Sequence, residues 1–142
     1  MPNLQRALEI AITAHKGQVQ KSGAPYVLHP LRLMFSLDSE EEQIAAVLHD
    51  VVEDTPWELA ELKAEGFSQE VIDALDCLTH QAGVDYESYI EKVAANSLAR
   101  AVKLADLRDN MNVIRLPTMN QQALDRLEKY HKAWLRLGGA ID

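Results

Sequence analysis

Hydrophobic residues recur every three or four positions through most of the chain, as Leu4, Leu8 and Ile12 do near its beginning. This spacing puts them on one face of an α-helix, and no stretch alternates hydrophobic and polar residues over the length of a β-strand. The predicted helices cover residues 4–15, a segment beginning at Pro30, a segment from Ser39 to about Asp54, and residues 57–66, 69–80, 86–95, 97–116 and 121–137. The pattern therefore predicts an all-α fold, a bundle of about seven or eight helices.

Local signals set the expected ends of these helices. Ser39 opens an S-x-x-E capping box, the pattern that begins many helices. Pro30 disfavours helical backbone angles at the preceding residue, so a helix is predicted to start at Pro30 with His29 at its mouth. Thr55-Pro56 is predicted to cap the helix that follows the 39–54 segment.

Length and composition fit an ordinary globular protein. The 142 residues match the usual size of one domain, so a single domain over residues 1–142 is predicted. The chain is 47% hydrophobic and 25% charged, which argues against wholesale disorder. No hydrophobic run is long enough to span a bilayer, the N-terminus does not resemble a secretory signal, and the single Cys77 cannot form an internal disulfide. These features predict a cytoplasmic protein.

The charge balance narrows the classes of partner. The chain carries 22 acidic and 14 basic residues, for a net charge of −8. An acidic domain has no general attraction for nucleic acid or anionic lipid, so neither nucleic acid nor membrane is predicted as a partner. A phosphorylated small molecule is compatible with this charge if cations or a metal gather in one cleft. The sequence does not specify an oligomeric state.

One predicted helix face gathers acidic residues with a histidine. At about 100° per residue, His49, Asp50, Glu53 and Asp54 fall together, opposite the hydrophobic side of the 39–54 helix. One interpretation is a solvated face. However, three acids near a helix C-terminus repel one another and oppose the helix dipole, and a bound cation would relieve both costs. Because adjacent residues diverge around a helix, His49 and Asp50 could not both point at one ion in ideal geometry.

Two further residues extend this candidate site. Asp106 lies among hydrophobic neighbours on its predicted helix, where a carboxylate is rare unless it is paired or bound to a metal. A structural ion pair with Lys103, Arg108 or Arg100 is the alternative. His29 alone would most often be a capping or packing residue. Together with His49 and Asp50, however, these two residues form a plausible set of nitrogen and oxygen donors for one divalent ion such as Mn, Fe, Co or Zn.

Three ordered motifs resemble a known family. They are AHKGQVQKSGAPYVLHP, AAVLHDVVEDT and AVKLADLRDNM, and the similarity spans roughly Leu4 to Met111. The H…HD…D pattern resembles the HD-domain metal phosphohydrolases. The full set, which includes HDxxED, is similar to the hydrolase domain of the RelA/SpoT alarmone enzymes, and most of all to the stand-alone small alarmone hydrolases. The resemblance therefore implies a single HD-type helical domain.

The resemblance also implies an activity and roles for named residues. The implied enzyme is a manganese-dependent hydrolase that removes the 3′-pyrophosphate of (p)ppGpp or (p)ppApp and releases pyrophosphate. The implied ligands of one Mn²⁺ ion are His29, His49, Asp50 and Asp106. Glu53 and Asp54 match the acidic pair near the attacking water. Residues in matched positions for nucleotide or phosphate contacts are Lys21, Asn110, Tyr26 and Lys103.

Two positions depart from the family pattern and leave the base preference open. Gln20 stands where the family commonly has an arginine beside Lys21, and Leu107 stands where many members have a basic residue. Glutamine lacks the flat cation of arginine, so guanine and adenine are both kept as candidate bases. Two other functions are also kept: a broader nucleotide phosphohydrolase that uses the same site, and a non-catalytic nucleotide-binding module.

Overall fold

The computed structural model describes residues 2–141, and these residues form helices and loops. The helices are α1 (Leu4–Ala14), α2 (Leu28–Phe35), α3 (Glu40–Leu48), α4 (Val51–Asp54), α5 (Leu59–Glu65), α6 (Gln69–Leu78), α7 (Tyr86–Ala94), α8 (Ser97–Asn110), the short 3₁₀ helix η1 (Val113–Arg115) and α9 (Gln121–Arg136). An isolated β-bridge joins Val19 to Pro25 within the first long loop. The all-α prediction is confirmed, and the division of the predicted 39–54 helix into α3 and α4 brings the described part of the chain to nine α-helices.

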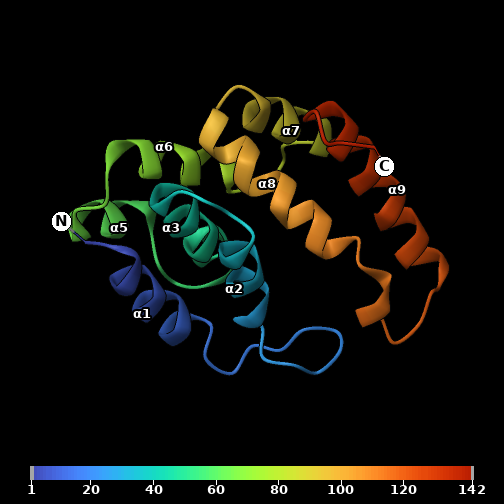
Figure 1. Cartoon of the computed structure of the whole chain (residues 1–142), viewed down its shortest axis with the longest axis horizontal. Coiled ribbons are helices and arrows are strands. Elements are labelled where there is room, and N and C mark those ends of the chain that lie inside the picture. The colour runs from blue at the N-terminus through green and yellow to red at the C-terminus, as the bar shows by residue number, and fades with distance from the viewer. Residues whose placement is uncertain (1, 142) are drawn as a thin grey trace.

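Helix α8 holds the bundle together. It packs against α2, α3, α6, α7 and α9. In Figure 1 the N-terminal helices α1, α3, α5 and α6 occupy the left of the view and α7 and α9 the right, with α8 running between them. The first loop, which connects α1 to α2, lies below the lower end of α8 in this view and leads into α2.

The hydrophobic core has two adjoining parts, and α3 contributes to both. Ala45 and Ala46 pack with residues of α7, α8 and α9, whereas Val47 and Leu48 pack with residues of α1, α5 and α6. Burying one aliphatic side chain of this size stabilises the fold by roughly 1.5–3 kcal/mol. Because α3 is enclosed on both sides, the residues at its C-terminal end are held at the centre of the molecule.

Several helix ends differ from the prediction. The capping box of Ser39 is confirmed, since its side chain accepts from the Glu42 amide and the Glu42 carboxylate accepts from the Ser39 amide. However, α2 begins at Leu28, so His29 lies in the first turn rather than at the mouth. Thr55 ends α4 instead of capping the next helix, which begins after Glu58. The 97–116 segment is also divided, because α8 stops at Asn110 and a separate 3₁₀ turn follows.

The predicted helix from Ser39 to Asp54 is wrong as one continuous element. It breaks at His49 and Asp50, where α3 ends and the four-residue α4 begins. The Ala46 carbonyl accepts the backbone N–H of His49 at 3.4 Å and also the His49 Nδ1–H at 2.6 Å. In a continuous helix this carbonyl would accept the N–H of Asp50 instead. The histidine side chain thus takes the acceptor that the next turn requires.

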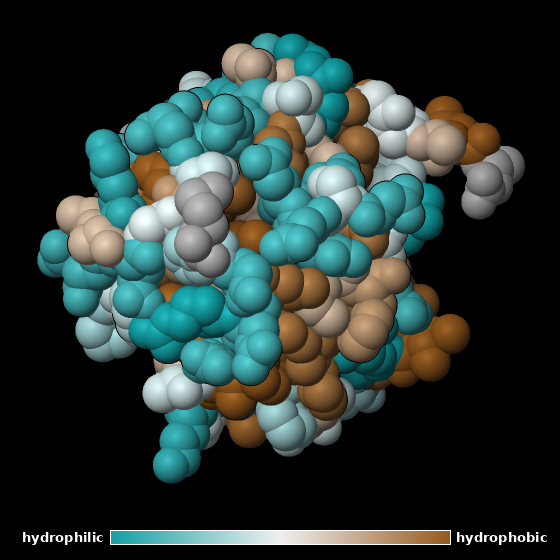
Figure 2. Space-filling model, turned by 60° about the vertical axis from the view of Figure 1, so that its left-hand side comes forward, coloured by the Kyte–Doolittle hydropathy of each residue, from teal (hydrophilic) through white to brown (hydrophobic). Residues whose placement is uncertain are grey.

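The surface combines polar and hydrophobic areas. Figure 2 shows hydrophobic side chains gathered into one area of the face drawn there, with polar side chains around it. The large exposed hydrophobic residues of α1 and α2 are Ile12, Leu28 and Phe35. None of the helices within residues 2–141 has the combination of length and hydrophobicity required to cross a bilayer.

The end of α9 folds back over the Trp134 ring. The Trp134 indole N–H donates to the Ala140 carbonyl at 3.0 Å, and a Cβ atom on Gly139 would lie 2.1 Å from the ring. Gly139→Ala therefore overpacks this turn and is expected to lower the free energy of unfolding by about 1–3 kcal/mol. Urea denaturation followed by tryptophan fluorescence measures it, with Ala140→Ser as the exposed neighbouring control. Equal midpoints for the two variants would contradict the expectation.

Candidate metal and phosphate site

The four side chains that the sequence analysis predicts as metal ligands meet in one place. His29 comes from α2, His49 and Asp50 from the break after α3, and Asp106 from α8. Asp106 Oδ1 lies 2.8 Å from His29 Nε2 and 3.5 Å from His49 Nε2, and Asp50 Oδ2 lies 2.9 Å from His49 Nε2. Donor atoms of His29, His49 and Asp50 all lie within 4.8 Å of one another. The predicted convergence from separate parts of the chain is therefore present.

The break between α3 and α4 lets neighbouring residues face one point. In a continuous helix His49 and Asp50 would diverge by about 100°. Here Asp50 is the N-cap residue of α4, with φ −102° and ψ 0°. Its carboxylate lies beside the imidazole of His49. The sequence predicts that adjacent residues on one helix could not both point at one ion. The break in the helix between α3 and α4 allows His49 and Asp50 to do so.

His49 has the form of an imidazole ready to bind a cation. Because a carbonyl oxygen only accepts hydrogen bonds, the contact with Ala46 keeps a proton on Nδ1, so Nε2 is the nitrogen that could offer a lone pair to a metal. That buried Nε2 has no hydrogen-bond partner among the described residues, although carboxylate oxygens of Asp50 and Asp106 lie nearby. Two buried carboxylates beside one imidazole nitrogen require a positive charge there, which either a proton on Nε2 or a bound cation would supply. The donor set therefore fits a divalent metal.

The charges of the cluster depend strongly on one another. Burial lowers the pKa of His49, but the carboxylates of Asp50 and Asp106 outweigh burial and raise it well above its ordinary value. Burial raises the pKa of Asp106, while Lys103 and the two histidines lower it further, so the net pKa lies well below the usual range. The Asp106 carboxylate is thus ionised and bound by cationic neighbours.

Lys103 and Asn110 contact Asp106 directly. The Lys103 ammonium donates to Asp106 Oδ2 at 2.8 Å and lies 5.2 Å from the centre of the Tyr89 ring, while the Asn110 amide donates to Asp106 Oδ1 at 3.1 Å. The ion pair with Lys103 that the sequence offered as an alternative is present, and it coexists with the contacts to the histidines. Both residues also line the pocket, so their roles as substrate contacts stay predictions.

The acidic pair lies on α4 beside the cluster. One carboxylate oxygen of Glu53 accepts from the His80 backbone N–H at 2.8 Å, which leaves the other oxygen free. Oxygens of Asp50, Glu53 and Asp54 lie within 4.8 Å of one another. Partial burial, followed by the charge of Asp50, raises the pKa values of both Glu53 and Asp54 above those of free carboxylic acids. A carboxylate whose pKa is raised is a better proton acceptor.

Tyr26 and Lys21 belong to the first loop. The Tyr26 hydroxyl donates to Asp50 Oδ2, and so it holds the Asp50 carboxylate in place beside His49. Burial and the nearby acids raise the pKa of Tyr26, so the phenol stays protonated. Lys21 lies at the pocket wall, where partial desolvation and the positive charge of Arg126 lower its pKa. Tyr26 is thus a supporting contact of the cluster, and Lys21 is available to a ligand.

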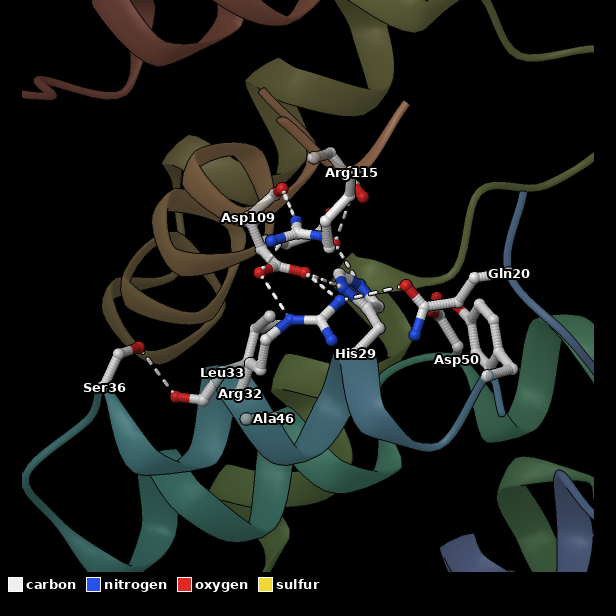
Figure 3. Close-up of polar contacts among 12 residues, drawn as sticks. Gln20, His29, Arg32, Leu33, Ser36, Ala46, Asp50, Asp109 and Arg115 are labelled. Atoms are coloured by element: carbon white, nitrogen blue, oxygen red, sulfur yellow. Dashed lines mark hydrogen bonds and ion pairs between the residues drawn. The ribbon is translucent and has the colours of Figure 1, made fainter. Parts of the chain in front are cut away.

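A second group of residues was not singled out by the sequence analysis. Asp109 accepts from His29 Nδ1 at 2.6 Å and from Arg32 at 2.8 and 3.0 Å, and it pairs with Arg115 at 3.0 Å (Figure 3). Arg32 also donates to Gln20 in the first loop at 3.0 Å. Helical spacing could have indicated this group, because Asp109 follows Asp106 by three residues and Arg32 follows His29 by three.

Most of these residues line one pocket of about 430 Å³. Three of the proposed ligands, His29, Asp50 and Asp106, form one part of its wall together with the acidic pair, whereas the buried His49 does not line it. The cationic residues on the wall are Lys21, Arg32, Lys103, Arg115 and Arg126. Arg126 and Tyr130 come from α9, so the first loop and the last helix both contribute to the pocket. A corner whose donors could hold a cation, next to several basic side chains, suits a phosphorylated ligand.

Comparisons with known proteins agree with this geometry. The family model described as "HD domain" matches residues 7–127. The chain is 33% identical to the guanosine-3′,5′-bis(diphosphate) 3′-pyrophosphohydrolase of Borreliella burgdorferi, over 94% of this chain and 22% of that protein. It is 30% identical to the bifunctional (p)ppGpp synthase/hydrolase SpoT of Escherichia coli, over 95% of this chain and 22% of that protein. The chain thus spans about a fifth of the length of these relatives.

A solved structure is similar to this chain over nearly the whole length of the chain. It is described as a metazoan ortholog of SpoT that hydrolyses ppGpp and has a role in starvation responses. The two share 26% sequence identity with a TM-score of 0.81, over 98% of this chain and 88% of the other. The family match over residues 7–127 and this likeness confirm the resemblance carried by the three motifs. The chain belongs to the HD-domain family, and its relatives within that family include SpoT-type pyrophosphohydrolases.

Proposed function

We propose that this chain is a metal-dependent hydrolase of a nucleotide alarmone, with residues 1–142 acting as one HD-type domain. The substrate is (p)ppGpp or (p)ppApp, and the reaction releases the 3′-pyrophosphate. The single observation that carries the proposal is the buried Nε2 of His49, which makes no hydrogen bond among the described residues and lies beside the carboxylates of Asp50 and Asp106, next to a pocket with a basic wall. The activities named for the relatives support the choice of substrate.

The proposed ligands of the metal are His29, His49, Asp50 and Asp106. Two imidazoles and two carboxylates suit Mn²⁺, Fe²⁺, Co²⁺ or Zn²⁺ better than Ca²⁺ or Mg²⁺, and we take Mn²⁺ as the ion from the family resemblance. A bound divalent ion supplies Lewis acidity toward a phosphoryl oxygen and lowers the pKa of water. Tyr26 supports the site by holding Asp50, and Lys103 and Asn110 support it by holding Asp106.

The residues of the chain account for the remaining parts of the reaction. Water attacks the phosphorus bonded to the ribose 3′-oxygen and that P–O bond breaks. The oxygen of the water ends in the released pyrophosphate, and the departing 3′-oxygen takes up a proton to become a 3′-hydroxyl. Glu53 or Asp54 orients the water and accepts its proton, in keeping with their raised pKa values. Lys21 and the arginines of the wall neutralise the negative charge of the 3′-diphosphate while it is attacked and after its release as pyrophosphate.

Product analysis tests the proposal. Guanosine and adenosine nucleotides with a 3′-diphosphate are incubated with the protein and Mn²⁺, and the products are separated by ion-exchange chromatography. The expected products are pyrophosphate and the nucleoside 5′-diphosphate, with no turnover in EDTA. Orthophosphate as the product would instead support a broader phosphohydrolase. Tight nucleotide binding without turnover in Mn²⁺ would support a non-catalytic binding module. Either result overturns the proposal.

Substitution of the acidic pair separates catalysis from metal binding. Glu53→Gln and Asp54→Asn remove proton acceptors but leave the four proposed ligands intact, so kcat is expected to fall about 10²–10⁴-fold in at least one variant. Mn²⁺ affinity is expected to change much less, as measured by isothermal titration calorimetry. Glu40→Gln on the exposed start of α3 is the control. Full activity in both variants would exclude the pair from the reaction.

A further inference from the structure

Asp109 lies behind His29, on the side away from the proposed metal position. Its carboxylate contacts three side chains from two other elements: His29 and Arg32 of α2 and Arg115 of η1. We infer that Asp109 is a positioning residue for the metal centre, which holds the His29 imidazole in the tautomer and orientation that turn Nε2 toward Asp106 and His49. The inference rests on the proposed metal-binding role of His29.

The two nitrogens of His29 face different partners. Nε2 lies 2.8 Å from Asp106 Oδ1, which in turn lies 3.5 Å from His49 Nε2, so Nε2 faces the shared centre. Nδ1 faces away and lies 2.6 Å from Asp109 Oδ2. A metal at the centre would take the lone pair on Nε2, and Nδ1 would then carry the proton and donate it to Asp109. Carboxylates in this position orient metal-binding histidines and increase their basicity.

The support of His29 differs from the support of His49. The Nδ1–H of His49 donates to the backbone carbonyl of Ala46, an acceptor that every residue type would provide. The Nδ1 of His29 relies on a side chain, so the residue at position 109 decides whether this histidine is held. Of the two imidazoles, only His29 can therefore be loosened by one substitution behind it.

The surroundings keep Asp109 in place and ionised. Arg32 binds both of its oxygens, as a flat guanidinium does with a carboxylate, and Arg115 pairs with Oδ1 while also donating to the Asp109 backbone carbonyl. His29 and Arg32 hold the pKa of Asp109 well below its usual range, against the effect of burial. Its side chain is only 12% exposed. A charged carboxylate fixed by two arginines is a rigid acceptor for Nδ1–H.

The same contacts connect the metal centre to the pocket wall. Arg32 and Arg115 both line the pocket, and Arg32 donates to Gln20 of the first loop (Figure 3). His29 is thus linked through Asp109 to cationic residues that a phosphorylated ligand can reach. Leu107 and Arg108, the two residues between Asp106 and Asp109, face elsewhere: Leu107 is in the core and Arg108 packs over Trp134.

Metal titrations of two variants test the inference. Asp109→Leu removes the acceptor at similar volume, and Asp109→Asn keeps an acceptor oxygen without the charge. Isothermal titration calorimetry with Mn²⁺ alone is expected to show affinity weakened by up to about 100-fold for the leucine variant and about 10-fold for the asparagine variant. Since the effect is on affinity, saturating Mn²⁺ is expected to restore most of kcat. Asp38→Asn, at an exposed position before α3, is the control.

The outcomes separate this inference from the proposed function. Wild-type affinity for Mn²⁺ in both Asp109 variants, with binding lost in His49→Ala, would overturn the positioning role and leave the metal centre intact. Absence of Mn²⁺ binding by the wild type would overturn both. If the leucine variant does not fold, the asparagine variant decides alone. In addition, ¹H–¹⁵N correlation spectra of the Zn²⁺-loaded wild type are expected to show His29 protonated at Nδ1, and protonation at Nε2 would contradict the inference.

Discussion

Asp106→Asn is expected to abolish Mn²⁺-dependent release of pyrophosphate. Asp106 contacts His29, Lys103 and Asn110 and lies beside His49, so loss of its charge affects every part of the cluster. The loss of activity is expected to exceed the ~10–100-fold that supporting residues around a metal typically contribute. Initial rates with purified protein measure it, with circular dichroism to confirm that the variant is folded.

A matched aspartate provides the control for this result. Asp76 also pairs with a lysine, Lys92, but the pair lies at the surface, with both side chains about half exposed. Asp76→Asn is therefore expected to keep wild-type activity, while His49→Ala is expected to lose activity as Asp106→Asn does. Appreciable turnover by Asp106→Asn, or by the wild type stripped of metal, would mean that hydrolysis does not depend on the proposed centre.

Lys103→Met is expected to destabilise the metal-free protein by about 3–5 kcal/mol, the usual cost of leaving one member of a buried ion pair without its partner. The Lys103 and Asp106 side chains are 12% and 7% exposed. Burial lowers the pKa of Lys103, but the Asp106 carboxylate outweighs burial and raises it, so the amine is charged. Denaturation in guanidinium chloride, with EDTA present, measures the change.

The Lys103→Met variant is compared with and without Mn²⁺, and with a substitution of a lysine at the surface. Mn²⁺ is expected to recover part of the lost stability, because it supplies positive charge beside Asp106 and binds only the folded state. Lys92→Met, at the exposed pair with Asp76, is expected to cost at most about 1 kcal/mol. Equal losses in the two lysine variants would show that the Lys103–Asp106 pair contributes no more than a surface pair does.

The helices and three of the four proposed ligands could be predicted because each leaves a local signal, whereas His29 was included only in combination with the other three. Hydrophobic spacing marks the core face of a helix, and the capping box at Ser39 marks the start of α3. Asp106 was identified because a carboxylate on a hydrophobic face requires a partner, and the structure supplies Lys103 and two imidazoles. A residue whose chemistry conflicts with its predicted surroundings is readily found from sequence.

The break at His49 and the role of Asp109 could not be predicted in this way. The break depends on where the His49 ring points, since its Nδ1–H takes the Ala46 carbonyl, and helical periodicity does not specify a side-chain contact. The spacing of three residues from Asp106 places Asp109 on the same face of α8 but does not identify what its carboxylate contacts. Its partners Arg32 and Arg115 are 77 and 6 positions away, so only the folded arrangement brings them together.

The interruption between α3 and α4 has a consequence for protein engineering. A peptide that copies residues 40–54, or a designed scaffold that grafts them onto an ideal helix, would restore the regular ladder and turn the two adjacent donors about 100° apart. Such a graft would retain the adjacent histidine and aspartate, but their side chains would no longer face the same point. A designer who wishes to borrow this centre must also copy the kink and the helices that enclose it.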